Sequence, residues 1–193
     1  MFVLTVDQRR SRRDVDRVPE LLRDLSAARV VRPFDRTAGD EVQAVLDDPE
    51  QVVTLALDLV RREHWSVGIG TGPVELPLPA VTRAGRGPAF EHARTAVERA
   101  KSAVTHLAVD GPDASAAEAA ATVLDLVALL VQRRSPEGWA AVELISTGHT
   151  QSSAAAVLGV SKQAVSQRLR ATAWQQEEAG RTLAASLLAE ADR

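Results

Sequence analysis

The segment 150–170, TQSSAAAVLGVSKQAVSQRLR, constrains the fold more than any other part of the chain. Its small, apolar and polar residues fall where two short helices that cross at a tight turn require them. Thr150 and Ser161 are of the types that cap a helix N-terminus. Gly159 lies between them and tolerates the left-handed conformation that ends many helices. The sequence therefore predicts two short helices joined at Gly159.

The second predicted helix has an apolar inner side and a polar outer side. Val165 and Leu169 lie four residues apart and are expected to point inward. The other side chains are mostly donors and acceptors of the kind that bind phosphates and base edges. We expect DNA contacts from Ser161, Lys162, Gln163, Ser166, Gln167, Arg168 and Arg170.

This pattern resembles the helix-turn-helix of bacterial transcription regulators, in which the second helix reads the major groove. The alternative is an ordinary helical hairpin with a polar outer face. Charge favours DNA, because residues 133–176 contain five basic and two acidic residues in a chain whose net charge is −3. Positive potential is therefore expected to gather at this end of the molecule.

Length and composition favour a globular protein with two domains. A chain of 193 residues, 45% of them hydrophobic, can bury two small cores. The lack of cysteine excludes disulfides and thiolate metal sites. The first residues lack the order of a secretory signal. The apolar stretch 119–131 is too short for a bilayer and contains Asp125, so we expect a buried or dimer-forming helix in a cytoplasmic protein without membrane contact.

Apolar periodicity predicts an N-terminal α/β domain of the α+β type over residues 1–112. The order βαββαβ, followed by a helix and a strand, is that of a palm-like, ferredoxin-like domain. Prolines are expected to make 74–81 an irregular edge strand. The other predicted strands are 2–6, 30–37, 42–46, 65–70 and 104–109, and the predicted helices are 15–28, 47–63 and 89–102.

An all-helical domain is predicted over residues 113–193. The Gly111-Pro112 pair stops the last strand, and the helix 116–134 follows. A further helix, which contains Trp139, is expected to pack behind the two crossed helices. A homodimer would place two reading helices one DNA turn apart.

Two aspartates are candidate ligands in the N-terminal domain. Asp7 ends the first strand, and Asp40 lies in the hairpin turn 38–41. If that strand lies beside the hairpin, the two carboxylates come close, as hard oxygen ligands of Mg²⁺ must. The alternative is that both serve only turns. Arg83 and Arg86 precede a predicted helix, where they are expected either to bind an anion or to form a solvated surface.

FDRTAGDEVQAVL, followed by a helix and WSVGIGTGPVELP, is similar to the palm of GGDEF diguanylate cyclases and class III nucleotidyl cyclases. The resemblance implies that Asp7 and Asp40 are metal carboxylates, and that the backbone of Ala38 and Gly39 approaches a nucleotide phosphate. Val42 departs from the signature phenylalanine, and Ala38 replaces its first glycine. The first strand is also followed by arginines that can bind phosphates or remain solvated: Arg9, Arg10, Arg12 and Arg13.

The whole chain resembles the SatD family of bacterial proteins. The resemblance rests on the strand ending at Asp7, the Gly39-Asp40 hairpin, GIGTG at 68–72, RGPAFEHARTAVERAK at 86–101 and the C-terminal helix pair. It implies a regulatory protein in which a cyclase-like palm is joined to a DNA-binding element. The glycines of GIGTG lack the Lys-Ser/Thr of a phosphate loop, so close strand packing explains them better.

The sequence thus predicts a homodimeric transcription regulator that binds double-stranded DNA and uses its palm for ligand sensing or dimerisation. No cofactor is required, while a nucleotide effector and Mg²⁺ remain open. One alternative is a Mg²⁺-dependent nucleotidyl cyclase or transferase acting through Asp7 and Asp40. The other is a protein-interaction module whose helix pair does not bind DNA.

Overall fold

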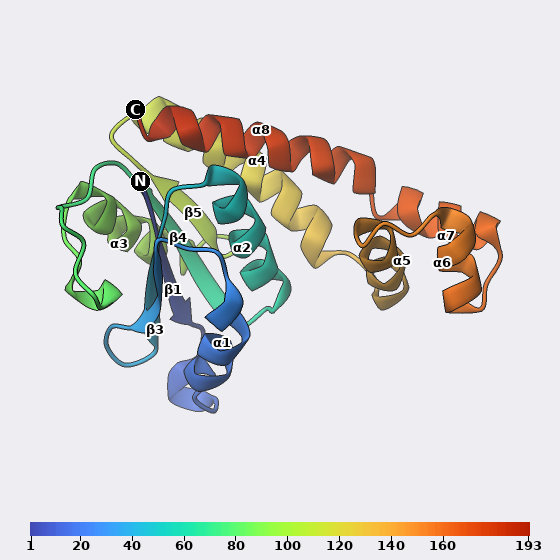
Figure 1. The fold of residues 1–193 in the computed structure, drawn as a ribbon, viewed down its shortest axis with the longest axis horizontal. Coiled ribbons are helices and arrows are strands. Elements are labelled where there is room, and N and C mark those ends of the chain that lie inside the picture. Colours follow the sequence, from blue (N-terminus) through green and yellow to red (C-terminus); the bar gives the residue numbers. More distant parts are fainter.

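A five-stranded mixed sheet and eight α-helices give the chain an α+β fold, as predicted (Figure 1). The computed structural model describes residues 1–193. The strands are β1 (Phe2–Gln8), β2 (Arg32–Arg36), β3 (Glu41–Leu46), β4 (Trp65–Thr71) and β5 (Leu107–Asp110). The helices are α1 (Val18–Asp24), α2 (Pro49–Arg61), α3 (Pro88–Ala100), α4 (Ala114–Gln132), α5 (Pro136–Ser146), α6 (Gln151–Leu158), α7 (Lys162–Ala171) and α8 (Trp174–Ala191).

The central strand of the sheet is β1, in the order β2-β3-β1-β4-β5. It pairs antiparallel with β3 and with β4, which places Asp7 opposite Glu41 on one side and Ser66 on the other. β2 is antiparallel to β3, and β5 is parallel to β4. Apart from the edge strand predicted at 74–81, the order of elements along the N-terminal half is the one that the sequence predicts.

Helices cover both faces of the sheet. On one face α2, α4 and α8 share a continuous core with Leu4 and Val6 of β1. On the other face α3 packs against β4, and its Phe90 contacts a small cluster that includes Val3. Alternate residues of β1 therefore pack against two different layers of helices, because successive side chains of a strand point to opposite faces of the sheet.

Two glycines let α3 lie close to β4. A Cβ atom on Gly68 would lie 2.2 Å from the backbone nitrogen of Val97. A Cβ atom on Gly70 would lie 2.2 Å from the carbonyl oxygen of Ala89. The interpretation of GIGTG as a close-packing motif is therefore confirmed.

The long helices α4 and α8 lie along the body, whereas α5, α6 and α7 project beyond it (Figure 1). Leu124 of α4 and Leu188 of α8 are fully buried in the core that also contains the sheet residues. The amino group of Met1 pairs with Asp192, which follows α8. The division at residue 113 stays a prediction: α4 and α8, which follow it, share one core with the sheet, whereas α6 and α7 have a small cluster of their own.

One strand prediction is wrong, and a second is wrong in part. Residues 74–81 form no strand, because their prolines lack the N–H group that pairing needs; carbonyls of this segment instead accept hydrogen bonds from the Arg32 side chain at 2.7 and 2.9 Å. The last strand begins at Leu107 and not at residue 104, because His106 has a φ of 57°, outside the extended region.

One helix, α4, has the length and hydropathy of a membrane span, with a mean hydropathy of 1.8. Its inner side, including Leu124 and Val127, is buried, and the helix packs against α8 and β5. Core helices of soluble proteins share these properties. The cytoplasmic location stays a prediction.

Gly70→Ala is expected to destabilise the fold by about 2–3 kcal/mol, because the added methyl group meets backbone atoms of α3. Gly180→Ala is the matched comparison. Its methyl group would meet only one methyl group of Val127, at 2.6 Å, and alanine favours a helix more than glycine does. Urea unfolding should therefore give a larger loss for Gly70→Ala. Equal losses would contradict the close contact between α3 and β4.

Candidate functional site

The two helices α6 and α7 are capped by the residues that the sequence predicts. The Thr150 hydroxyl accepts a hydrogen bond from the Ser153 N–H at 3.1 Å, and Gly159 ends α6 with a φ of 65°. The Ser161 hydroxyl accepts from the Ala164 N–H at 3.1 Å. Val165 is fully buried and belongs to a small cluster with alanines of α6. The predicted pair of helices and its turn are therefore present.

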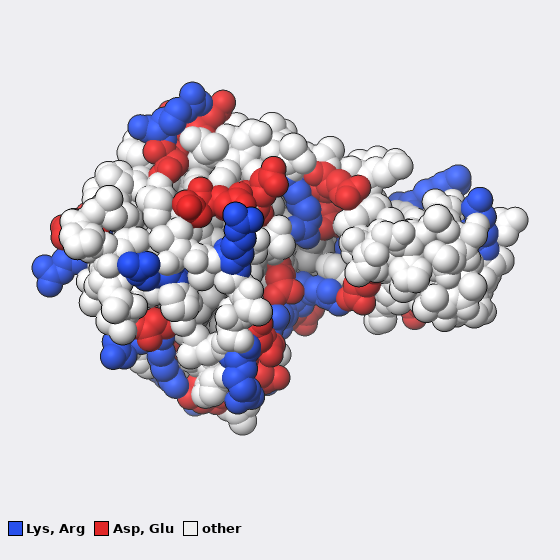
Figure 2. Space-filling model, in the orientation of Figure 1, with Lys and Arg blue, Asp and Glu red and all other residues white.

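The outer side of α7 is accessible along its whole length. Ser166 and Arg168 are half-buried, and the other expected DNA-contact residues are exposed: Ser161, Lys162, Gln163, Gln167 and Arg170. Figure 2 shows Lys and Arg side chains at the projecting end of the molecule, with few acidic side chains on the face in view. No salt bridge involves Lys162, Arg168 or Arg170, so their charges are available to a partner.

A groove of about 520 Å³ lies between the outer side of α7 and the start of α8. Ser166 and Arg170 lie on one wall, and Gln175 and Gln176 lie on the other. Ala173, with a φ of 50°, makes the turn that sets the two helices at an angle. The sequence pattern did not identify Gln175 and Gln176. It predicted a helix through this region and did not show the turn at Ala173 that places the two glutamines beside α7.

An aromatic side chain joins the projecting helices to the body. The ring of Trp139 in α5 is contacted by Arg61, the last residue of α2, at 3.7 Å from the ring centroid, and by Arg134 at 4.2 Å. Arg61 also donates to Glu143 of α5 at 2.5 Å. Cation–π contacts of this kind favour one placement of α5 on α2.

A buried ion pair lies at the same junction. Arg134 pairs with Glu177 of α8, and the side chains of both are inaccessible to solvent. Glu177 also accepts from Arg181 at 2.8 Å. Two guanidinium nitrogens of Arg134, Nε and Nη1, have no hydrogen-bond partner. Because buried charges are costly unless paired, each member of this pair depends on the other.

A cavity of about 1010 Å³ opens where β1 ends, and we call it the palm cavity. The backbone N–H of Gln8 donates to the carbonyl of Asp40 at 3.1 Å, so the structure brings Asp7 and Asp40 to the same place. Gly39 lines the cavity and Ala38 does not. The fifteen lining residues include no hydrophobic one, and the charged ones are Asp7, Arg9, Arg10, Arg12, Arg13, Asp14, Asp16, Arg36, Asp40 and Lys101.

An ammonium group occupies the place beside Asp7. Lys101, which follows α3, lies with Nζ 3.3 Å from Oδ2 of Asp7 and 2.7 Å from Glu98. Burial raises the pKa of Asp7, Lys101 opposes this, and Asp40 and Glu41 add to it. No group of three or more acidic or histidine side chains is arranged to hold a metal ion. With a lysine on Asp7, the residues present do not fit a divalent cation.

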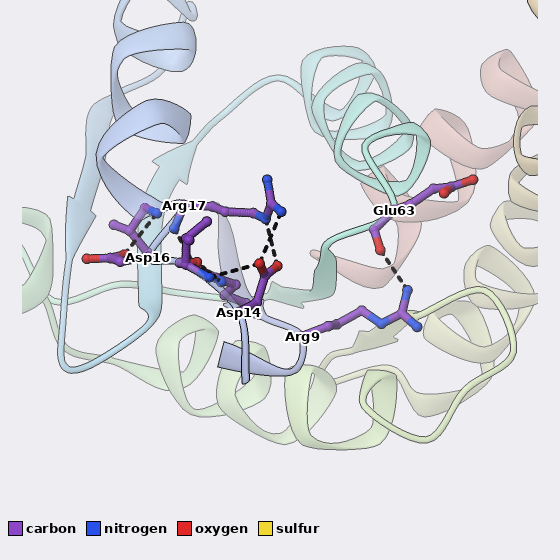
Figure 3. A network of polar contacts seen from close by, with 8 residues as sticks. Arg9, Asp14, Asp16, Arg17 and Glu63 are labelled. Carbon is purple, nitrogen blue, oxygen red and sulfur yellow. Dashed lines mark hydrogen bonds and ion pairs between the residues drawn. The ribbon is translucent and has the colours of Figure 1, made fainter. Parts of the chain in front are cut away.

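The arginines after β1 differ in how they are held (Figure 3). Arg9 donates to the backbone carbonyl of Glu63 at 2.9 Å, whereas Asp14 is paired with Arg17 at 2.8 Å. Burial lowers the pKa of Arg9, and the charge of Arg10 lowers it further. The neighbouring charges of Arg9 and Arg10 therefore repel each other.

Arg83 and Arg86 do not reach the palm cavity. They precede the N-terminus of α3, while Lys101 follows its C-terminus, and the helix has thirteen residues, about 20 Å. Arg83 instead lies 3.8 Å from Asp35. The two residues are exposed, and nothing in their surroundings forms a cavity with Asp7 and Asp40.

Comparisons with protein-family models, with curated proteins and with solved structures give no match to this chain.

Glu177→Gln is expected to destabilise the protein by about 3–5 kcal/mol, because it leaves the Arg134 guanidinium buried without a counter-charge. The double variant Arg134→Met, Glu177→Leu removes both buried charges and should cost less than Glu177→Gln alone. Urea unfolding followed by circular dichroism measures both. A double variant less stable than the single one would contradict the mutual dependence of the pair.

Asp7→Asn is expected to stabilise the protein at neutral pH. Because burial raises the pKa of Asp7 above its ordinary value of 3.8, the folded state carries this charge at a cost. The cost is present above the folded-state pKa and is lost as pH falls through it towards 3.8. Thermal unfolding should give the variant a higher Tm than the parent at neutral pH. The difference between the two Tm values should shrink as the pH is lowered. A lower Tm for the variant at neutral pH would contradict this account.

Proposed function

We propose that the chain binds duplex DNA through the outer side of α7 and acts as a transcription regulator. The observation that carries this proposal is the exposure of Lys162, Gln163, Gln167 and Arg170 on a short helix capped by Ser161 and backed by fully buried residues. A rigid helix that presents donors and acceptors on one side is what major-groove reading requires.

The residues divide by their chemistry. Gln163, Gln167 and Arg170 have side chains that can make paired hydrogen bonds with base edges, and the Ser166 hydroxyl can make a single one. Lys162 and Arg168 are suited to phosphates, which position a protein on the duplex without reading its sequence. A homodimer would place two copies of α7 about 34 Å apart, one turn of DNA.

In this proposal the body is a palm that senses a ligand or forms the dimer. The antiparallel order β2-β3-β1-β4 and the meeting of Asp7 with Asp40 favour a palm, and the resemblance to the SatD family is retained as part of the proposal. The cyclase or transferase alternative is disfavoured, because Lys101 lies where a metal ion would contact Asp7.

Gln167→Ala and Lys162→Ala test the two kinds of contact. Gln167→Ala should lower discrimination at one base pair by about 1–3 kcal/mol. Lys162→Ala should weaken binding to all duplexes alike and reduce the slope of log affinity against log salt by about 0.9. Gel shifts with genomic DNA selected by the protein itself measure both.

Arg94→Ala is the control for these variants, because Arg94 is exposed on α3 and makes no ion pair. Its DNA binding should equal that of the parent. If the parent gives no salt-dependent shift with any duplex, DNA binding is wrong and a protein-interaction module is favoured.

A further inference from the structure

We propose that the palm cavity binds a polyphosphate anion directly through arginine side chains, without a divalent cation and without recognition of a base. This inference deepens the proposed sensor role of the palm and rests on it for its biological meaning. The chemistry of the site itself is independent of DNA binding.

Several arginines that line the cavity have no carboxylate partner. Lys101 is paired with Asp7, and Arg36 is paired with Asp16 at 2.9 Å. Asp14 is already neutralised by Arg17, which lies outside the lining. The lining cations with no carboxylate partner are Arg9, Arg10, Arg12 and Arg13.

Two of these arginines flank one tight turn and line the same two cavities. Residues Ser11–Arg13 form one turn of 3₁₀ helix, and the N–H of Arg13 donates to the carbonyl of Arg10 at 2.8 Å. Arg10 and Arg13 line both the palm cavity and a neighbouring cavity of about 880 Å³. Their guanidinium groups can therefore act together on one multivalent anion.

Lys101 supplies the positive charge that a metal ion would otherwise bring to Asp7. Lys101 contacts Oδ2 of Asp7, so a metal ion brought to that oxygen would be repelled by the ammonium group. The lining holds six cations against four carboxylates, of which only Asp40 has no ion pair. A phosphate chain that enters the cavity therefore meets a net positive surface and needs no bridging ion.

The cavity has no apolar side chain for a nucleobase. None of its lining residues is hydrophobic, and none is an aromatic residue other than His106. Bases are usually bound by stacking on apolar or aromatic side chains. The shared chemistry of free polyphosphate and of a nucleotide tail is thus the feature that this surface can recognise.

Calorimetric titration of the full chain with tripolyphosphate, in EDTA at fixed ionic strength, tests the proposal. We expect saturable binding that MgCl₂ in place of EDTA does not strengthen, and affinities for ATP and GTP within about threefold of that for tripolyphosphate. A strict need for Mg²⁺, or nucleotide binding more than about tenfold tighter, would overturn the proposal. So would the absence of binding.

The variant Arg10→Gln, Arg13→Gln should lose at least about tenfold in affinity. Arg94→Gln removes an exposed arginine outside the cavity and should bind as the parent does. Both replaced arginines are exposed, so circular dichroism should show an unchanged fold. Equal losses in the two proteins would overturn the site, since they would indicate unspecific attraction.

DNA binding is measured on the same proteins without polyphosphate. Tripolyphosphate binding without any DNA shift would leave this site in place and end the proposed function. A DNA shift without tripolyphosphate binding would support the proposed function and overturn the anion site.

Discussion

The structure depends on one strand that is hydrogen-bonded on both edges. β1 has buried neighbours on both faces, so its backbone groups must find partners within the sheet. The pairing with β3 and β4 runs along its length from Phe2 to Asp7. This register sets Asp7 beside the β2–β3 hairpin and places the following arginines at the mouth of the palm cavity. A change of register by one residue would move every side chain of β1 to the opposite face of the sheet and disrupt the packing on both faces.

The junction between the body and the projecting helices contains a buried ion pair, where most cores contain only apolar side chains. Arg134 and Glu177 are fully buried at the point where α4 ends and α8 begins. Beside this ion pair, Trp139 of α5 contacts Arg61 at the end of α2. Such a pair contributes little net stability, because desolvation offsets attraction, but a misplaced partner is heavily penalised. The junction therefore fixes the direction of α7 more than it strengthens the fold.

Local signals in the sequence were sufficient for the helices that carry the candidate DNA contacts. The caps at Thr150 and Ser161 and the turn at Gly159 each depend on a few neighbouring residues, so they were predicted correctly. The close packing at Gly68 and Gly70 was also predictable, because glycines that alternate in a strand point to one face.

Features that join distant segments were not predictable in the same way. Lys101 meets Asp7 only because α3 crosses β4 at the two glycines and ends level with the end of β1. Arg61 meets Trp139 because α2 and α5 converge at the junction. The anion site at Arg83 and Arg86 stays a prediction, and that end of α3 lies far from the aspartates. Such contacts depend on the length and angle of whole helices, which no short pattern contains.

The palm cavity and α7 are connected by continuous contacts. Arg9 at the cavity holds the carbonyl of Glu63, just beyond α2, by one hydrogen bond. The last residue of α2, Arg61, contacts Trp139 of α5, and α5 packs on α6 and α7. The bond from Arg9 goes to a neutral carbonyl, whereas an anion in the cavity would offer it a stronger, charge-assisted bond. An anion would thus compete with the segment after α2 for the same guanidinium, and the end of α2 is where the projecting helices are attached.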